Sequence, residues 1–253
     1  MLLTGRILLC AAVAGTAILA GTDDGMVTIP AGVFTMGRTK LTSDDSTKMR
    51  PHVLLDDRPA HPVTLRSFQF DATEVTNEAY AQFILSSHHR VPYHWQQGKP
   101  PAESETLPVY NVSWEDADAY CRWAGKRLPT EAEWERAARG GLDGLDYPSG
   151  DKLDAKQARF NVPDGPGPVK AYPPNAFGLY GMAGNVSEWT ADWFDGGYYG
   201  RGEASDPKGP SGGDYKVIRG GAWSDSPRRV TVFFRNWVRP SQRTPNIGFR
   251  CAQ

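Results

Sequence analysis

Residues 113–139 read SWEDADAYCRWAGKRLPTEAEWERAAR, and this stretch predicts two helices joined by a tight turn. Ser113, followed three positions later by Asp116, is typical of a helix start, because the serine oxygen can accept a hydrogen bond from an otherwise unpaired backbone N–H. Gly125 and Pro129 lie between the helices. Glycine adopts the left-handed conformation found just past a helix end, and proline cannot continue a helix.

The second helix is predicted by Thr130 and Glu133, which form the S/T-x-x-E pattern of a capping box. Five residues of the first helix recur at helical spacing and define one buried face: Trp114, Ala117, Tyr120, Cys121 and Ala124. Trp134 directs the second helix into a core. Taken alone, the stretch is a stable helical hairpin and carries no function.

The same stretch resembles the central motif of the formylglycine-generating enzyme family, whose members have the sulfatase-modifying factor fold. Four further segments resemble that family in the same order: MVTIPAGVFTMG (26–37), RPAHPVTLRSFQFDATEVTNEAYAQF (58–83), NAFGLYGMAGNVSEWTADW (175–193) and VIRGG…NIGFRCA (217–252). The resemblance implies an α+β formylglycine-generating-enzyme fold, with a C-type-lectin-like core and little regular secondary structure.

Composition agrees with one large, loop-rich domain. The chain has 253 residues, of which 40% are hydrophobic, 27 are glycine and 20 are proline. The formal net charge of −1 provides no basic surface of the kind that nucleic-acid-binding proteins use. We therefore expect no nucleic-acid partner, and the sequence leaves the oligomeric state open.

Residues 1–20 resemble a secretory signal peptide. Arg6 precedes the apolar run ILLCAAVAGTAILA (7–20), which ends in small residues and is shorter than the roughly 20 residues of a membrane-spanning helix. We predict cleavage near Ala20, a mature domain of residues 21–253 and a periplasmic or secreted protein with no membrane contact after leader removal. Lipidation at Cys10 is the alternative, although no small residue precedes that cysteine.

Two cysteines, Cys121 and Cys251, remain beyond the leader. In an exported chain, two cysteines favour a disulfide over two free thiols. The resemblance implies the same pairing, because family members join the cysteine of the helical hairpin to the cysteine of the final GFRC motif.

The copper chemistry of the family requires residues that this chain lacks. Residues 220–235 read GGAWSDSPRRVTVFFR and contain no cysteine, whereas the active enzymes carry two copper-binding cysteines shortly after the RGG motif. Ala222 replaces the serine of that motif, and Ser187 replaces a tryptophan of GNVWEW. We therefore expect neither a copper cofactor nor cysteine-dependent formylglycine generation, and we assign no catalytic residue.

Structural calcium is expected from the resemblance, at two sites that use hard oxygen ligands. The second site corresponds to the carbonyls of Gly184 and Val186 and the carboxylate of Glu188, with Gly181 in place of a side-chain ligand. An alternative is that Glu188 pairs with Arg219 or Arg250. The first site corresponds to three residues: Asn161, Val162 and Asp164.

The segment after the RGG motif supplies the candidate ligand-binding residues Trp223, Asp225, Arg228 and Arg229. Aromatic rings and arginines dominate binding surfaces, because they bury area and offer planar donors. The alternative is that the neighbouring aromatics fill the core and the arginines pair with acids. We expect Arg235 to support the fold.

Other segments predict local structure. Residues 27–29 and 33–36 alternate as short strands, which a turn at 30–32 joins as a hairpin, and residues 63–70 alternate again. Thr76 caps a further helix. His88, His89 and His94 lie close in sequence, but no carboxylate motif accompanies them, so a solvated loop is favoured over a metal site.

Two functions remain open. In the first, the chain is an exported accessory or binding protein that holds a protein or peptide partner in the former substrate groove. In the second, it is a periplasmic oxidoreductase that acts without cysteines on a protein or siderophore, similar to the pyoverdine-maturation member of the family. The lack of histidine beyond residue 94 favours the first, because a metal triad in the C-terminal half would need such ligands.

Overall fold

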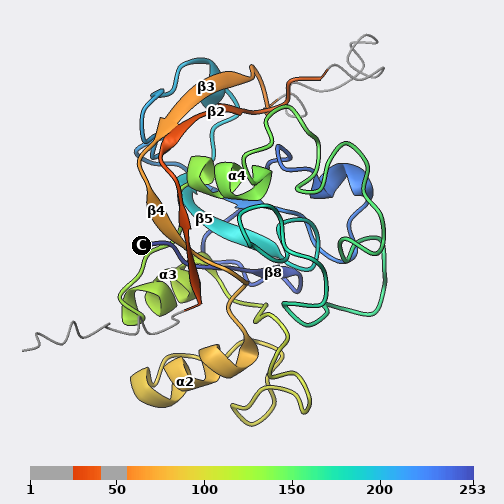
Figure 1. Cartoon of the computed structure of the whole chain (residues 1–253). Helices are drawn as coiled ribbons and strands as arrows, with labels where there is room; N and C mark the ends of the chain where they lie inside the picture. Colours follow the sequence, from red (N-terminus) through yellow and green to blue (C-terminus); the bar gives the residue numbers. More distant parts are fainter. Residues whose placement is uncertain (1–24, 41–55) are drawn as a thin grey trace, which may run out of the picture.

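The computed structural model describes residues 25–40 and 56–253, and its helices and strands are short segments between long loops (Figure 1). The predicted leader, residues 1–20, lies outside the described residues. The architecture is α+β with little regular secondary structure, as predicted.

The described residues form three α-helices: α2 (Asn77–Ser87), α3 (Trp114–Trp123) and α4 (Glu131–Arg139). Both predicted capping patterns of the hairpin form complete capping boxes, because Asp116 and Glu133 each accept from the backbone N–H of their own cap residue. Helix α2 begins at the predicted cap, where the Thr76 side chain accepts from the Ala79 N–H.

The N-terminal strands do not form the predicted hairpin. Strand β1 (Met26–Ile29) pairs antiparallel with β4 (Phe68–Asp71), while β2 (Gly32–Met36) pairs antiparallel with β3 (His61–Leu65). Alternation identified the strands correctly but could not identify their partners. The alternating run 63–70 likewise divides into parts of two strands, which belong to different sheets.

The largest sheet has four strands in the order β7-β6-β5-β8. These are β5 (Ser187–Trp193), β6 (Lys216–Arg219), β7 (Asn236–Val238) and β8 (Ile247–Gly248). Strand β8 lies parallel to β5, and the chain then continues past β4, where the backbone N–H of Asp71 donates to the Cys251 carbonyl. Cys251 thereby reaches α3 and forms a disulfide with Cys121, the pairing that the resemblance implies.

Helix α4 packs against β2, β5 and β6, so that it lies at the centre of the molecule (Figure 1). Its polar face is buried in a network of ion pairs. Arg219 bridges Glu131 at 3.1 Å and Glu135 at 2.6 Å, and Arg235 donates to Glu131 at 2.6 Å. The predicted structural role of Arg235 is thus confirmed.

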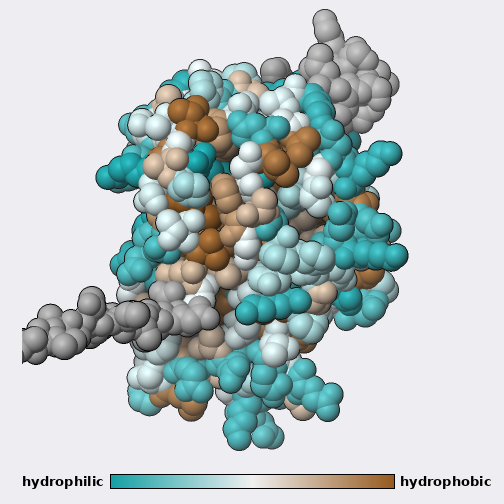
Figure 2. All heavy atoms as spheres, viewed as in Figure 1, coloured by the Kyte–Doolittle hydropathy of each residue, from teal (hydrophilic) through white to brown (hydrophobic). Residues whose placement is uncertain are grey.

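Apolar side chains form two main buried clusters. One lies around Trp134 of α4 and includes Ile29, Phe34, Phe70, Leu179 and Val232, and the other lies around Tyr80 of α2 and includes Phe83, Tyr120, Trp189 and Phe249. On the face shown in Figure 2, hydrophobic residues occur in small groups between hydrophilic ones. Among residues 25–40 and 56–253, we find no helix long and apolar enough to cross a membrane.

Candidate functional site

An aromatic cluster forms where the loop after β6 meets the segments that follow α2 and precede α3. The rings of His94 and Tyr110 stack with their centroids 4.0 Å apart, and the Trp223 ring meets Tyr110 edge-on at 5.6 Å. All three side chains are half-buried, so the cluster reaches the surface. The sequence predicts Trp223 at such a surface, but it places His94 in a solvated loop and does not single out Tyr110.

His94 is held as a neutral imidazole. Burial lowers its pKa to about 4, and the Asn111 amide lies 3.2 Å from Nδ1, where it can donate. The proton of the neutral ring then belongs on Nε2. Nε2 is buried and has no hydrogen-bond partner among the described residues. The cluster therefore combines aromatic faces with one uncommitted polar atom.

Backbone hydrogen bonds fix the position of Trp223. Its N–H donates to the carbonyl of Asn185, and its carbonyl accepts from the N–H of Val162, both at 2.9 Å. The N–H of Asn161 donates to the carbonyl of Asp225 at the same distance. The structure thereby brings two residues of the first predicted calcium site beside the predicted ligand-binding segment.

The polar residues of that segment make local contacts. Asp225 accepts from the backbone N–H of Ala222 at 2.9 Å through Oδ2, and its Oδ1 lies 3.5 Å from Arg229. Arg228 and Arg229 are exposed on a 3-10 turn, Pro227–Val230. Asp225 therefore shapes the turn, and of the four predicted residues only Trp223 joins the aromatic cluster. Trp237 lies apart from this cluster and stacks on Phe194.

The carboxylate of Glu188 is buried in β5 and paired with Arg250. Its Oε1 accepts from Arg250 Nη2 at 2.7 Å, while its Oε2 accepts from Arg250 Nε at 2.8 Å and from Trp134 Nε1 at 2.7 Å. This is the ion pair that the sequence offers as the alternative to calcium. A carboxylate has about four lone-pair positions, so these three donors leave one.

A second buried carboxyl group, that of Glu74, lies next to this pair, and its Oε1 accepts from the Asn185 side chain at 2.9 Å. Glu74 is buried, its Oε2 lies 3.8 Å from Arg250 and has no hydrogen-bond partner among the described residues, and burial raises its pKa to about 7. A Cβ on Gly181 would lie 2.4 Å from Glu74 Oε1, so the Glu74 carboxylate fills the space beside that glycine.

These residues fit a cation in charge and in donor type. The carbonyls of Gly184 and Val186 accept no hydrogen bond within the described part of the chain, and the two carboxylates face a single guanidinium. Oxygen donors of this kind are the ligands that calcium prefers. At the first predicted site, only the type of donor atom suits calcium. The Asp164 carboxylate there is exposed, and its charge is already balanced by Arg159 at 3.5 Å.

The three histidines that lie close in sequence have different surroundings in the structure. His89 Nε2 lies 2.8 Å from Asp116, which also accepts from Arg90, whereas His94 stacks on Tyr110 and His88 is exposed at the end of α2. Within residues 25–40 and 56–253, no three His, Cys, Asp or Glu side chains are grouped closely enough to hold a metal by themselves.

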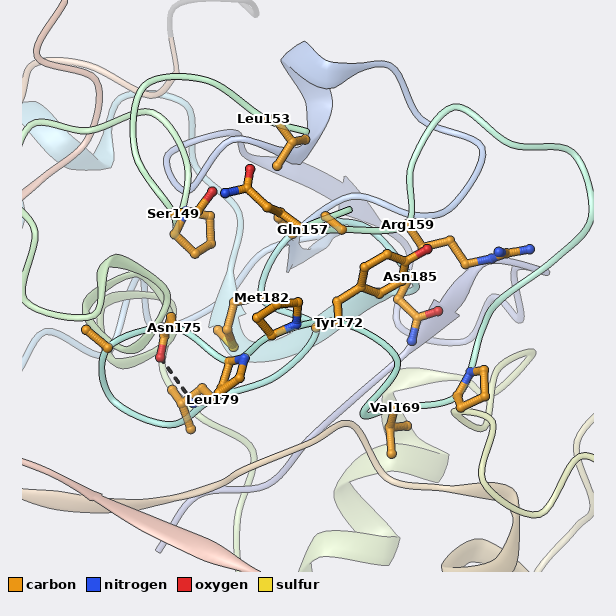
Figure 3. Close-up of a pocket in the computed structure, with 18 residues that line it drawn as sticks. Ser149, Leu153, Gln157, Arg159, Val169, Tyr172, Asn175, Leu179, Met182 and Asn185 are labelled. Atoms are coloured by element: carbon orange, nitrogen blue, oxygen red, sulfur yellow. Dashed lines mark hydrogen bonds between the residues drawn. The ribbon is translucent and has the colours of Figure 1, made fainter. Parts of the chain in front are cut away.

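A cavity of about 300 Å³ is lined by residues between positions 148 and 185 (Figure 3). Its wall includes Arg159 and Asn185, which hydrogen-bond to one another through the Asn185 N–H and the Arg159 carbonyl. Because Asn185 also accepts the N–H of Trp223, the cavity and the aromatic cluster are built on adjoining backbone segments. Residues 140–175 are rich in glycine and proline, a composition that predicts a long loop but gives no sign of a cavity.

Known proteins resemble the chain over nearly all of its length. A formylglycine-generating enzyme from Streptomyces coelicolor is 36% identical, over 96% of this chain and 93% of its own length. The mouse protein named inactive C-alpha-formylglycine-generating enzyme 2 is 33% identical, over 91% of this chain and 86% of its own.

Solved structures agree with the fold. PvdO from Pseudomonas aeruginosa has a TM-score of 0.75 at 29% identity, covering 90% of this chain and 93% of its own. Treponema denticola variable protein 1 has a TM-score of 0.73 at 27% identity, covering 90% and 94%. A model of the sulfatase-modifying factor enzyme 1-like domain matches residues 13–253, and the chain belongs to this family.

Proposed function

We propose that this protein is an exported member of the family that binds a protein or peptide partner at the aromatic cluster of His94, Tyr110 and Trp223. The observation that carries the proposal is the cluster itself, because it places half-buried aromatic rings beside the segment that forms the active-site rim in the family. Partly exposed aromatics supply large contact area at a low cost in side-chain entropy.

The residues after the RGG motif support binding rather than copper chemistry. The stretch 220–235 contains no cysteine, and Ala222 stands where the family has a serine. Soft thiolate ligands are what select Cu(I), so copper has no such ligand here. The similarity to a mouse protein named inactive C-alpha-formylglycine-generating enzyme 2 also supports a member of the family without this enzymatic activity.

The test is a peptide selection with a matched tryptophan control. A phage-displayed random peptide library is selected on the full chain, and enriched peptides are measured against Trp223→Ala and Trp123→Ala. Trp123 is 46% exposed on α3, where it contacts Phe83 and not the aromatic cluster. Its variant therefore controls for non-specific binding of peptides to an exposed tryptophan. We expect Trp223→Ala to weaken binding at least tenfold, as hot-spot tryptophans do. Peptides that bind both variants like the wild type would sink the proposal.

The second candidate is an oxidoreductase that acts without cysteines on a protein or siderophore. Its support is the likeness to PvdO and the neutral His94, whose Nε2 is uncommitted. Elemental analysis of protein purified without chelator separates the two. Stoichiometric iron or copper would favour the oxidoreductase, whereas calcium alone at one or two equivalents would favour the binding protein.

For calcium, we propose a site formed by the carbonyls of Gly184 and Val186 and the carboxylate of Glu188, with Glu74 as the adjacent negative charge. The first predicted site, formed by Asn161, Val162 and Asp164, would be the more exposed of the two. When bound, calcium would supply positive charge that ties these loops together. The support is the buried, unpartnered Oε2 of Glu74 and the excess of carboxylate over guanidinium.

Thermal unfolding in calcium, magnesium and chelator tests both sites. Calcium at about 100 times its Kd should stabilise the fold by about 2.7 kcal/mol, an effect that Glu188→Gln should reduce and magnesium should not reproduce. Asp164→Asn should affect only the weaker, exposed site. An unchanged melting temperature in calcium and in chelator would exclude both assignments.

For localisation, we propose export to a periplasm or to the outside of the cell after cleavage near Ala20. N-terminal sequencing of the protein recovered from an expressing bacterium is the direct measurement. A mature N-terminus at or next to residue 21 is expected. A product that retains Met1 in the cytoplasm would contradict export and would weaken the case for an oxidised Cys121–Cys251 pair.

A further inference from the structure

We propose that the cavity of Figure 3 is a binding site for a neutral aromatic group that carries a hydrogen-bonding edge, such as a phenol or an indole. This site is separate from the aromatic cluster at Trp223 and goes beyond the function proposed above. The cavity measures about 300 Å³, at the lower end of the range for ligand pockets and about twice the volume known to hold a benzene ring.

The walls of the cavity are rigid and largely apolar. The Tyr172 ring and the side chains of Leu153 and Met182 form part of the wall. Four prolines form another part: Pro148, Pro168, Pro173 and Pro174. Proline has a fixed φ and little freedom to lose, so a wall built from it is preorganised. Figure 3 shows Tyr172 projecting among these groups.

Hydrogen bonds hold the base of the cavity in place. The Asn175 side chain donates to the carbonyls of Ala137 and Ala138 in α4 and accepts from the N–H groups of Phe177 and Leu179. Asn175 is therefore fully committed to structure, and the loop that carries Tyr172 is anchored to the central helix. A cavity framed in this way stays open without a ligand.

The remaining polar groups define the ligand. Tyr172 Oη and Ser149 Oγ make no hydrogen bond within the described residues. The Gln157 side chain accepts the Asp154 N–H through Oε1, and its Nε2 makes no hydrogen bond there either. Arg159, the one charged residue of the lining, already donates to the Gly165 carbonyl at 2.7 Å. Within residues 25–40 and 56–253, no carboxylate lines the cavity, which favours a neutral ligand over a cationic one.

Calorimetric titration of the full chain with p-cresol, indole and N-acetyltyrosinamide tests the site. For ligands of this size we expect saturable binding with Kd of about 1 mM or lower. Binding of p-cresol alone identifies a free small molecule as the occupant, whereas equal or tighter binding of N-acetyltyrosinamide identifies a side chain of a polypeptide. Both results support the site, and the absence of saturable binding by all three probes would overturn it.

Variants locate the binding. Ala176→Phe fills the cavity from an exposed position and should weaken p-cresol binding at least tenfold, while Ala171→Phe, also exposed but outside the lining, should leave it unchanged. Tyr172→Phe should weaken p-cresol about fivefold, as expected for one lost hydrogen bond, and should not affect toluene. Binding that survives Ala176→Phe, or that Trp223→Ala abolishes, would place the ligand elsewhere and refute the proposal.

Discussion

Asp192 should make the protein less stable as the pH rises. This carboxyl group is buried in β5, and its Oδ2 accepts the backbone N–H of Glu131 at 2.7 Å, at the start of α4. Burial raises its pKa to about 8, and the nearby Glu131 carboxylate acts in the same direction. Arg235 acts in the opposite direction but offsets the shift only in part, because it is already paired with Glu131.

The sign of the effect follows from proton counting. Between the ordinary aspartate pKa near 4 and the folded value of about 8, the native state keeps a proton that the unfolded state releases. The free energy of unfolding therefore falls by about 1.4 kcal/mol for each pH unit across this window. Asp192→Asn keeps an oxygen acceptor for the Glu131 N–H but cannot ionise. The free energy of unfolding of the variant, measured relative to that of wild type, should therefore increase by about 4 kcal/mol from pH 5 to pH 8.

Urea unfolding of both proteins at pH 5, 6, 7 and 8 measures this difference. Other buried acids, such as Asp56 with a pKa raised to about 7, titrate in both proteins and cancel in the comparison. Asp154→Asn, on an exposed loop, is the matched control. A stability difference that stays constant with pH, or that shrinks as the pH rises, would refute the reasoning.

Three further predictions concern stability and local environment. Replacing Cys121 and Cys251 with alanine should lower the free energy of unfolding by about 5 kcal/mol, because the disulfide closes a loop of 130 residues; urea curves with and without reductant check this. Arg250→Met should cost about 3–5 kcal/mol, since it leaves the Glu188 charge buried without a cation, and Glu188→Gln in the same chain should recover part of that loss. Lys216 lies between two tryptophan rings, and burial lowers its pKa to about 8, so tryptophan fluorescence should titrate with a midpoint near pH 8 in wild type and not in Lys216→Met.

Local chemistry explains which parts of the fold could be predicted. The two helices of residues 113–139 were predictable because each start is a contact between residues three positions apart, such as Ser113 with Asp116. The partner of β1 was not, because β4 lies about 40 residues further along and alternation reports a buried face but not its neighbour. The predicted hairpin failed for that reason.

The same distinction applies to the candidate site. Trp223 could be placed at a surface from its own segment, but His94 and Tyr110 join it only because three distant loops converge. Glu74 carries no local sign of its surroundings either. Its Oε1 accepts from Asn185, whereas its Oε2 has no hydrogen-bond partner among the described residues, because Arg250 donates to Glu188. Sequence motifs thus predicted the helices and the family fold, whereas the side chains that meet at each candidate site depend on contacts between distant segments.

The cavity and the aromatic cluster share one structural support. Both are built on loops, and both are held by backbone hydrogen bonds to the segment that contains Asn185. The buried acids Asp192 and Glu74, whose pKa values are raised to about 8 and about 7, lie instead at the centre of the fold. Catalytic acids and bases need contact with a substrate, so perturbed acids that are sealed in the core act on stability. The proposed binding function therefore rests on the aromatic cluster and on the cavity.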